Sequence, residues 1–373
     1  MAFIDTILGR YRSHPEAAIV TCFFNPTKSE YRRKAYDQFY KKIKHMNHRI
    51  VECAIGEDPF QLPKGPNVRQ IRTKTLLWHK EALLNMAIKD LPQEIKYVFW
   101  IDADVIFTNK RWMKDAVRKF KAGARILQPF EYCIHLEKDQ VKPDFDVDEA
   151  ERFCGDKELR NPRMWRSFTA NVSDDCDWED EDYNIHGHVG FAWGAVREVA
   201  EFGLFDRGLV GGADHVMAHA AAGQINHKCI TKAFDNDLKI IEEWSKRFNK
   251  IVQGAVDYVG GDLYHIWHGD LSKRQYLKRI KDFDKMSGTV QKKDHNGLYT
   301  TDDTTATDYV MNYFIAREVM DMFDSTDTVQ DASVVDTGFQ GFGGGTTGGG
   351  GATGTWDDPQ PLDTADNINE NYS

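Results

Sequence analysis

The chain has 373 residues, of which 41% are hydrophobic and 12% aromatic, and this excludes a disordered polymer for most of its length. It has no run of about 18 apolar residues, so no transmembrane helix is predicted. Asp5 interrupts the N-terminal apolar segment, so a secretory signal is not expected. The six cysteines are scattered without a CxxC pair, which predicts reduced thiols, without disulfides or a zinc site, in the cytoplasm of a bacterium or of a phage-infected host.

The net charge of −10 is unevenly distributed. The chain has 48 basic and 58 acidic residues, and residues 301–373 contain 14 of the acidic ones and a single basic one, Arg317. Residues 1–300 therefore keep 47 basic and 44 acidic residues, a net charge of +3. The acidity belongs to the C-terminal part and says little about what the rest of the chain binds.

Strand-like and helix-like segments alternate through the first half. Apolar runs predict strands at 17–24, 49–56, 96–107, 124–130 and 188–195, and helical spacing predicts helices at 27–44, 74–88 and 110–120. Alternation of this kind favours an α/β fold with a mixed, mostly parallel sheet flanked by helices. The polar stretch 138–183 is expected to form long loops that contribute to an acceptor site.

The composition changes after residue 295. We expect a body at 1–295, a helical extension at 296–325 with a helix at 308–323, and a Gly-rich acidic tail at 326–373. The run GFQGFGGGTTGGGGATG at 338–354 is of low complexity, and such composition is typical of a flexible linker.

The motif with the clearest chemistry is Asp102-Ala103-Asp104. It interrupts an apolar strand, and two carboxylates two residues apart point to the same side. Like charges at a half-buried strand end need compensation, and a divalent cation supplies it. Oxygen ligands suit Mg²⁺ or Mn²⁺, which also bind phosphate oxygens. The motif therefore predicts a cation site at Asp102 and Asp104, unless the two are solvated turn residues.

Three further segments carry candidate site residues. His265 and His268, in HIWHG, offer an imidazole to the cation, and Lys273 and Arg274 are candidates for phosphate contacts. Asp214 follows a glycine pair and is either a functional carboxylate or a helix N-cap. Lys80 and Asn85, in WHKEALLN, are the polar candidates on the nucleotide side.

These motifs, in this order, resemble the GT-A glycosyltransferases. The resemblance covers residues 17–283 and rests on KEALLN, DAD, GFAWGA, GGAD and HIWHG taken together. It implies a Rossmann-type GT-A-like fold and a nucleotide-diphosphate sugar as donor. It also implies Asp214 as catalytic base, His268 or His265 as metal ligand, and an acceptor side at Trp193, Gly211 and Gly212. Ala213 replaces an acidic residue of the family's pattern.

The resemblance predicts an inverting, metal-dependent transfer of a sugar to a hydroxyl of a glycan or lipid-linked glycan. A hydroxymethylated DNA base is an alternative acceptor because residues 1–300 are slightly basic, although they contain no concentrated Lys/Arg stripe. A sugar nucleotidyltransferase is disfavoured because the first strand is followed by Asn25-Pro26-Thr27-Lys28, which has no glycine. A non-catalytic binding module for carbohydrates or nucleotide sugars remains the alternative from another class.

Overall fold

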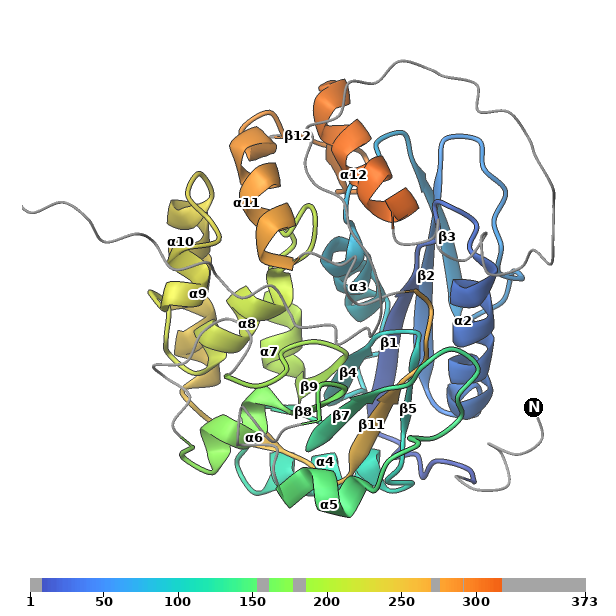
Figure 1. Ribbon diagram of the computed structural model, residues 1–373, viewed down its shortest axis with the longest axis vertical. Coiled ribbons are helices and arrows are strands. Elements are labelled where there is room, and N and C mark those ends of the chain that lie inside the picture. The colour runs from blue at the N-terminus through green and yellow to red at the C-terminus, as the bar shows by residue number, and fades with distance from the viewer. Residues whose placement is uncertain (1–8, 153–160, 177–185, 270–275, 291, 317–373) are drawn as a thin grey trace, which may run out of the picture. The chain divides into compact units, whose positions relative to one another are not determined.

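The computed structural model describes residues 9–152, 161–176, 186–269, 276–290 and 292–316 (Figure 1). The chain divides into a unit at Met1–Ser325 and a second unit at Thr326–Ser373, and the described ranges all lie in the first. Within these ranges no helix is both long enough and apolar enough to cross a membrane.

A seven-stranded sheet organises the described part of the first unit (Figure 1). In spatial order its strands are β10 (Val256–Tyr258), β6 (Ile126–Gln128), β9 (Ala192–Val196), β4 (Tyr97–Ile101), β1 (Ala17–Phe23), β2 (His48–Ile55) and β3 (Val68–Thr73). Only β9 runs antiparallel to its neighbours in this sheet. The expected mixed, mostly parallel sheet is confirmed.

Helices cover both faces of this sheet because successive strand residues point to opposite sides. Trp100 belongs to the buried cluster that contains the apolar side chains of α3 (Lys80–Lys89) and α7 (Arg197–Phe202). On the other face Phe99 meets Trp112 of α4 (Trp112–Lys121) edge to face, with 5.0 Å between ring centroids. Tyr36 of α2 (Glu30–Ile43) packs on that face as well. Burying a ring such as Phe99 contributes roughly 1.5–3 kcal/mol.

A four-stranded sheet adjoins the large one. Its order is β5 (Val105–Phe107), β11 (Asp262–His265), β7 (Tyr132–His135) and β8 (Met164–Arg166). β11 runs parallel to β7 and antiparallel to β5, so the ends of β7 and β11 lie level with the start of β5. The remaining elements are α5 (Val147–Arg152), α6 (Phe168–Ser173), α8 (Ala213–Ala221), α9 (Lys228–Thr231), α10 (Leu238–Val252), α11 (Tyr276–Ser287), β12 (Lys292–Lys293), β13 (Tyr299–Thr300) and α12 (Thr304–Ala316).

Two predicted strands are shorter than expected, each for a local reason. The run 96–107 is two strands, since β4 ends at Ile101 and β5 begins at Val105 in the other sheet. The run 188–195 forms a strand only from Ala192, because Phe191 has a φ of +74°. A β-branched or aromatic residue rarely adopts that conformation, and it ends extended pairing there.

The predicted C-terminal helix begins earlier than expected. α12 starts at Thr304, where the Asp303 carboxylate accepts from the Thr305 N–H at 2.9 Å. Phe314 of α12 stacks on Trp78, with 5.7 Å between centroids, so this helix packs next to the start of α3. Residues 317–323 of the predicted helix, and the Gly-rich run, lie outside the described residues. The predicted loops at 138–183 contain α5, β8 and α6.

Candidate functional site

Asp102 and Asp104 lie where the chain passes from the large sheet to the small one. Asp102 directly follows β4, and Asp104 directly precedes β5. The Asp102 N–H donates to the Phe191 carbonyl at 2.7 Å, and the Asp104 carbonyl accepts from the Ile266 N–H at 2.8 Å. The carboxylates are 28% and 24% exposed. The turn is thus fixed by main-chain bonds at the C-terminal end of a parallel strand, where ligands bind in open α/β sheets.

Asp104, His265 and His268 bring three ligand atoms together. Asp104 Oδ2 lies 2.9 Å from His268 Nε2 and 3.8 Å from His265 Nε2. The two Nε2 atoms are 3.2 Å apart. Both imidazoles are buried, whereas the carboxylate remains partly exposed. Two imidazole nitrogens and one carboxylate oxygen therefore converge on one point from β11, the segment after it and the turn before β5.

Two of these separations, 2.9 and 3.2 Å, match adjacent ligands of one cation, and the third, 3.8 Å, is wider. Ligand atoms about 2.1 Å from one ion are about 3.0–3.4 Å apart when they are adjacent in octahedral or tetrahedral coordination. Mg²⁺ prefers oxygen ligands almost exclusively, so a set with two imidazoles suits Mn²⁺ better. His265 Nδ1 lies 3.2 Å from His135 Nδ1. With its Nε2 on a cation, His265 would carry its proton on Nδ1 and donate it to His135, a role that a carboxylate, a main-chain carbonyl or water fills in most metal sites.

Lys80 forms a second group with two carboxylates. Its Nζ lies 2.8 Å from Asp102 Oδ1 and 3.3 Å from Asp214 Oδ2. Lys80 is the first residue of α3. A cation there is opposed by the helix dipole, so the position is unfavourable unless carboxylates offset it. Asp214 is the second residue of α8, whose N-cap is Gly212, so its role is not that of an N-cap.

Burial sets the electrostatics of the Lys80 group. Burial raises the pKa of Asp102 to about 7, and the ammonium of Lys80 opposes the shift. Glu81, which is 2% exposed, has its pKa raised to about 8 by burial, again against the effect of Lys80. Burial alone would lower the pKa of Lys80, but the charges of Asp102, Asp214 and Glu81 outweigh it and raise that pKa. Lys80 therefore stays charged and holds the carboxylates together.

Phe191 links the Asp102 turn to the histidines. Its ring stacks on His265, with 4.8 Å between centroids, and on His188 at 4.3 Å. Its carbonyl accepts from Asp102, as described above, and its backbone holds the strained φ of +74°. Strain of this kind costs about 1–3 kcal/mol and persists where the surroundings impose it, often at functional sites.

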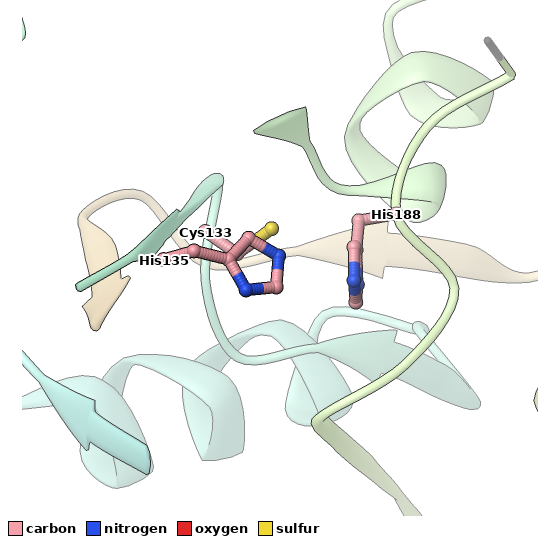
Figure 2. A group of neighbouring side chains, drawn as sticks. All are labelled: Cys133, His135 and His188. Atoms are coloured by element: carbon pink, nitrogen blue, oxygen red, sulfur yellow. The ribbon is translucent and has the colours of Figure 1, made fainter. Parts of the chain in front are cut away.

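A second group of possible ligands adjoins the first through His135. Cys133 and His135 lie two residues apart on β7 and face His188 from a separate segment (Figure 2). The ligand atoms of these three residues lie within 4.8 Å of one another. The His188 Nδ1, however, accepts from the Gly190 N–H at 3.2 Å. His135 is thus placed between this group and the Asp104 group, where it orients His265.

Two expected site residues serve the fold. Both polar atoms of the Asn85 amide bind the main chain of Leu204, with Nδ2 donating at 3.0 Å and Oδ1 accepting at 2.8 Å. Asn85 therefore ties α3 to the loop after α7, where the sequence had predicted a contact with the nucleotide. Trp193 is 1% exposed and its indole N–H donates to the Val189 carbonyl, so it lies in the core rather than on an acceptor surface.

Gly211 and Gly212 also have a packing role. Their φ values are +99° and +90°, and a Cβ on Gly211 would lie 2.6 Å from Arg279 Nη2. A Cβ on Gly212 would lie 2.6 Å from Cδ1 of Ile280. The glycines therefore let α11 approach the main chain closely, whereas the sequence had predicted that an acceptor would do so. Lys273 and Arg274 lie outside the described residues.

The structure adds residues that the sequence interpretation missed. These are His135, His188, Phe191 and Glu81. The alternation of Cys133 with His135, and of His186 with His188, is the one sequence signal that pointed to two of them. β7 and β11 pair in parallel although they are 130 residues apart, so no local sequence pattern predicts that they are neighbours.

Comparison with known proteins gives distant structural likenesses. No family model matches the chain, and no curated protein matches it. Among solved structures, S. aureus TarS 1–349 is similar with a TM-score of 0.36 and 8% identity over 83% of this chain and 73% of that one.

Another similar structure is glucosyl-3-phosphoglycerate synthase from Mycobacterium tuberculosis in complex with Mn²⁺, UDP-glucose and phosphoglyceric acid. Its TM-score is 0.33, with 9% identity over 80% of this chain and 88% of that one. Scores and identities this low assign no activity to this chain, so a functional conclusion depends on the site itself.

Proposed function

We propose that the protein is a metal-dependent glycosyltransferase that uses a nucleotide-diphosphate sugar. The proposal rests on two groups of side chains that meet at the turn of Asp102 and Asp104. Asp104 joins His265 and His268 in a set suited to a cation, and Asp102, two residues earlier, joins Lys80 and Asp214. The GT-A-like motif order in the sequence agrees with this placement.

Asp104, His265 and His268 are the residues that would hold the cation, with Mn²⁺ preferred over Mg²⁺. Such a cation neutralises a diphosphate and stabilises it as leaving group. The three ligands leave coordination positions for phosphate oxygens, because a cation of this type usually takes more than three ligands. Asp102 is only partly exposed and bound to Lys80, so in this proposal it contacts the donor through its exposed edge.

Asp214 is the proposed general base. Its carboxylate is 22% exposed and lies beside Lys80, outside the cation group. A base needs hydrogen-bond reach to the acceptor hydroxyl without being occupied by the metal. Lys80 positions Asp214 relative to Asp102 and thus relative to the donor. A base on the face opposite the diphosphate gives inversion at the sugar carbon.

The acceptor in this proposal is a hydroxyl of a glycan or a lipid-linked glycan. The chemistry of the site requires a hydroxyl within reach of Asp214 and sets no other condition. A screen of acceptors with one donor therefore follows the identification of the donor, with hydroxymethylated DNA included in the panel.

The decisive experiment measures donor binding and hydrolysis with and without metal. Calorimetric titration of nucleoside diphosphates into the native protein should show binding that needs Mn²⁺ and disappears with chelator. Asp104→Ala should lose this binding and the hydrolysis of a nucleotide sugar. Asp90→Ala is the matched control, because Asp90 lies at the opposite end of α3 from Lys80 and pairs with Arg69 on the surface.

Two results would contradict the proposal. Undiminished hydrolysis in excess chelator would remove the metal from the reaction. Metal-dependent binding of a nucleotide sugar, without hydrolysis or transfer to any acceptor of the panel, would identify a binding module in place of an enzyme.

A further inference from the structure

A second group of buried ligands lies away from the carboxylates. His186, His219 and Cys229 place one ligand atom each within 4.8 Å of one another. They come from the segment before β9, from α8 and from α9. His186 and His219 are fully buried, and Cys229 is 3% exposed. Three ligands from three segments thus meet inside the protein.

Two more imidazoles surround this group. His215 is on the same face of α8 as His219, four residues earlier, and its ring centroid is 5.2 Å from that of His186. His227 stacks on His219 with 4.2 Å between centroids. Its Nδ1 accepts from the Cys229 N–H, so the N-cap of α9 fixes the ring. Packing alone explains one buried histidine more easily than four in mutual contact.

The hydrogen bond of His186 leaves Nε2 as the nitrogen that can bind a metal. His186 Nδ1 lies 3.1 Å from the Gly187 carbonyl, which is an acceptor, so Nδ1 carries the proton. The lone pair of the neutral ring is then on Nε2. A main-chain carbonyl that orients an imidazole in this way is the usual support of a metal ligand.

We propose that His186, His219 and Cys229 bind a structural zinc ion, distinct from the cation of the active site. Two imidazoles and one thiolate suit zinc, whereas a thiolate is a poor ligand for Mg²⁺ or Mn²⁺. His215 and His227 are the neighbouring imidazoles from which a fourth ligand would come. The scattered cysteines gave no sign of it in the sequence, since a single cysteine with two histidines forms no CxxC pattern.

The proposed zinc site would also help to hold Asp214 in place. α8 carries His219 near its end and Asp214 near its start. A zinc ion between α8, α9 and the segment before β9 would fix this helix from one side, while Lys80 fixes Asp214 from the other. The zinc proposal does not depend on sugar transfer, since it concerns different residues.

Cobalt substitution tests the proposal on the full chain. Co²⁺ bound to a thiolate gives a sulfur-to-cobalt charge-transfer band, and the Asp104, His265 and His268 set contains no sulfur. Protein stripped of metal and loaded with Co²⁺ should show this band, and so should Asp104→Ala. Cys229→Ser should lose the band. Cys133→Ser, the control from the neighbouring Cys133, His135 and His188 group, should keep it.

Metal content gives a second readout, independent of the absorption band. Asp104→Ala purified with zinc and dialysed should retain about one zinc ion per chain. His219→Ala should retain less than a tenth of that amount. Chelator should lower the melting temperature of Asp104→Ala but leave that of the double variant Asp104→Ala/Cys229→Ser unchanged.

Two outcomes would overturn the proposal. One is the absence of both retained zinc and a thiolate band in the native chain. The other is a band that survives in Cys229→Ser and disappears in Cys133→Ser, which would place the ion at the Cys133 group. If the native chain shows the thiolate band but no transfer activity, the proposed function is contradicted and the zinc proposal is not affected.

Discussion

Asp214 contacts Lys80 and stands outside the set of ligands that converge on Asp104. Asp214→Asn is therefore expected to bind donor and Mn²⁺ as the native protein does, while transfer falls by about 100- to 10,000-fold, the usual loss for a general base. Calorimetry and a transfer assay measure the two effects. Asp206→Asn, which removes a surface partner of Lys293, is the control. Transfer at a near-native rate would reduce Asp214 to a partner of Lys80, and product of retained configuration would exclude inversion.

His135 is expected to position His265 rather than to contact the cation itself. With a cation on His265 Nε2, the His135 Nδ1 at 3.2 Å would accept from His265 Nδ1. His135→Ala should therefore weaken Mn²⁺ binding by about 10- to 100-fold, as loss of such support does in other metal sites. Electron paramagnetic resonance of free Mn²⁺ measures the change. His45→Ala is the matched control, because His45 bonds only to the main-chain carbonyl of Tyr11 among the contacts described for it. Equal Mn²⁺ affinity in both variants would refute the positioning role.

At the scale of elements, β11 and α5 meet in a carboxylate pair. Burial raises the pKa of Asp262 to about 7, and Glu151, to which it donates its proton, adds to the shift. A carboxyl group with a raised pKa binds more protons in the folded than in the unfolded state. The free energy of unfolding should therefore fall as pH rises from about 4 to about 7. The stabilisation that protonated Asp262 provides at low pH is lost above that range.

Asp262→Asn tests this dependence. The melting temperature of the variant relative to the native protein should rise between pH 5 and pH 8, because the amide does not ionise. Differential scanning calorimetry across that range gives the comparison, and Asp58→Asn, at a surface pair with Lys28, supplies the control. Parallel curves for the variant and the native protein would show that Asp262 ionises normally.

The sequence predicted the elements of the large sheet better than the ends of those elements. Apolar runs identified β1, β2 and β4 because strands buried on both faces read as continuous hydrophobic stretches. β3, with the sequence VRQIRT, alternates weakly at the sheet edge and was missed. The breaks at Asp102 and Phe191 depend on contacts with distant segments, so no local pattern could locate them.

The candidate site was predicted in part for a similar reason. Asp102, Asp104 and the histidines stand out because polar residues interrupt apolar strands. The ion pair of Lys80 with Asp214 joins residues 134 positions apart, and it was not predicted as a pair. Trp193 and the two glycines were predicted on the acceptor side, and the structure shows Trp193 buried and the glycines against α11. In sequence, a core tryptophan and a tight helix contact resemble an exposed platform and a ligand loop.

At the scale of the whole molecule, the large and small sheets share one turn. β4 and β5 belong to different sheets and are joined by Asp102, Ala103 and Asp104. The small sheet assembles from short strands at 105–107, 132–135, 164–166 and 262–265, and strands this short carry little periodic signal. The cation group therefore forms only when segments from the first and last thirds of the described chain pair.

The C-terminal part beyond this body has a composition that opposes packing. Residues 326–373 are rich in glycine and carry acidic residues without a basic one. From this composition we expect too little apolar surface to offset the entropy lost on ordering. Deletion of 326–373 should therefore leave the melting temperature and donor hydrolysis nearly unchanged. Scanning calorimetry and a hydrolysis assay on the shortened chain measure both.

The control and the alternatives for this deletion follow from α12. A longer deletion from residue 304 also removes Phe314, which stacks on Trp78 and contacts Phe24, so it should lower the melting temperature clearly. A large drop after removal of 326–373 alone would show that this part packs on the body. Unchanged stability and hydrolysis with loss of acceptor transfer would instead show that the C-terminal part recruits the acceptor, because the donor site depends on residues that the deletion leaves in place.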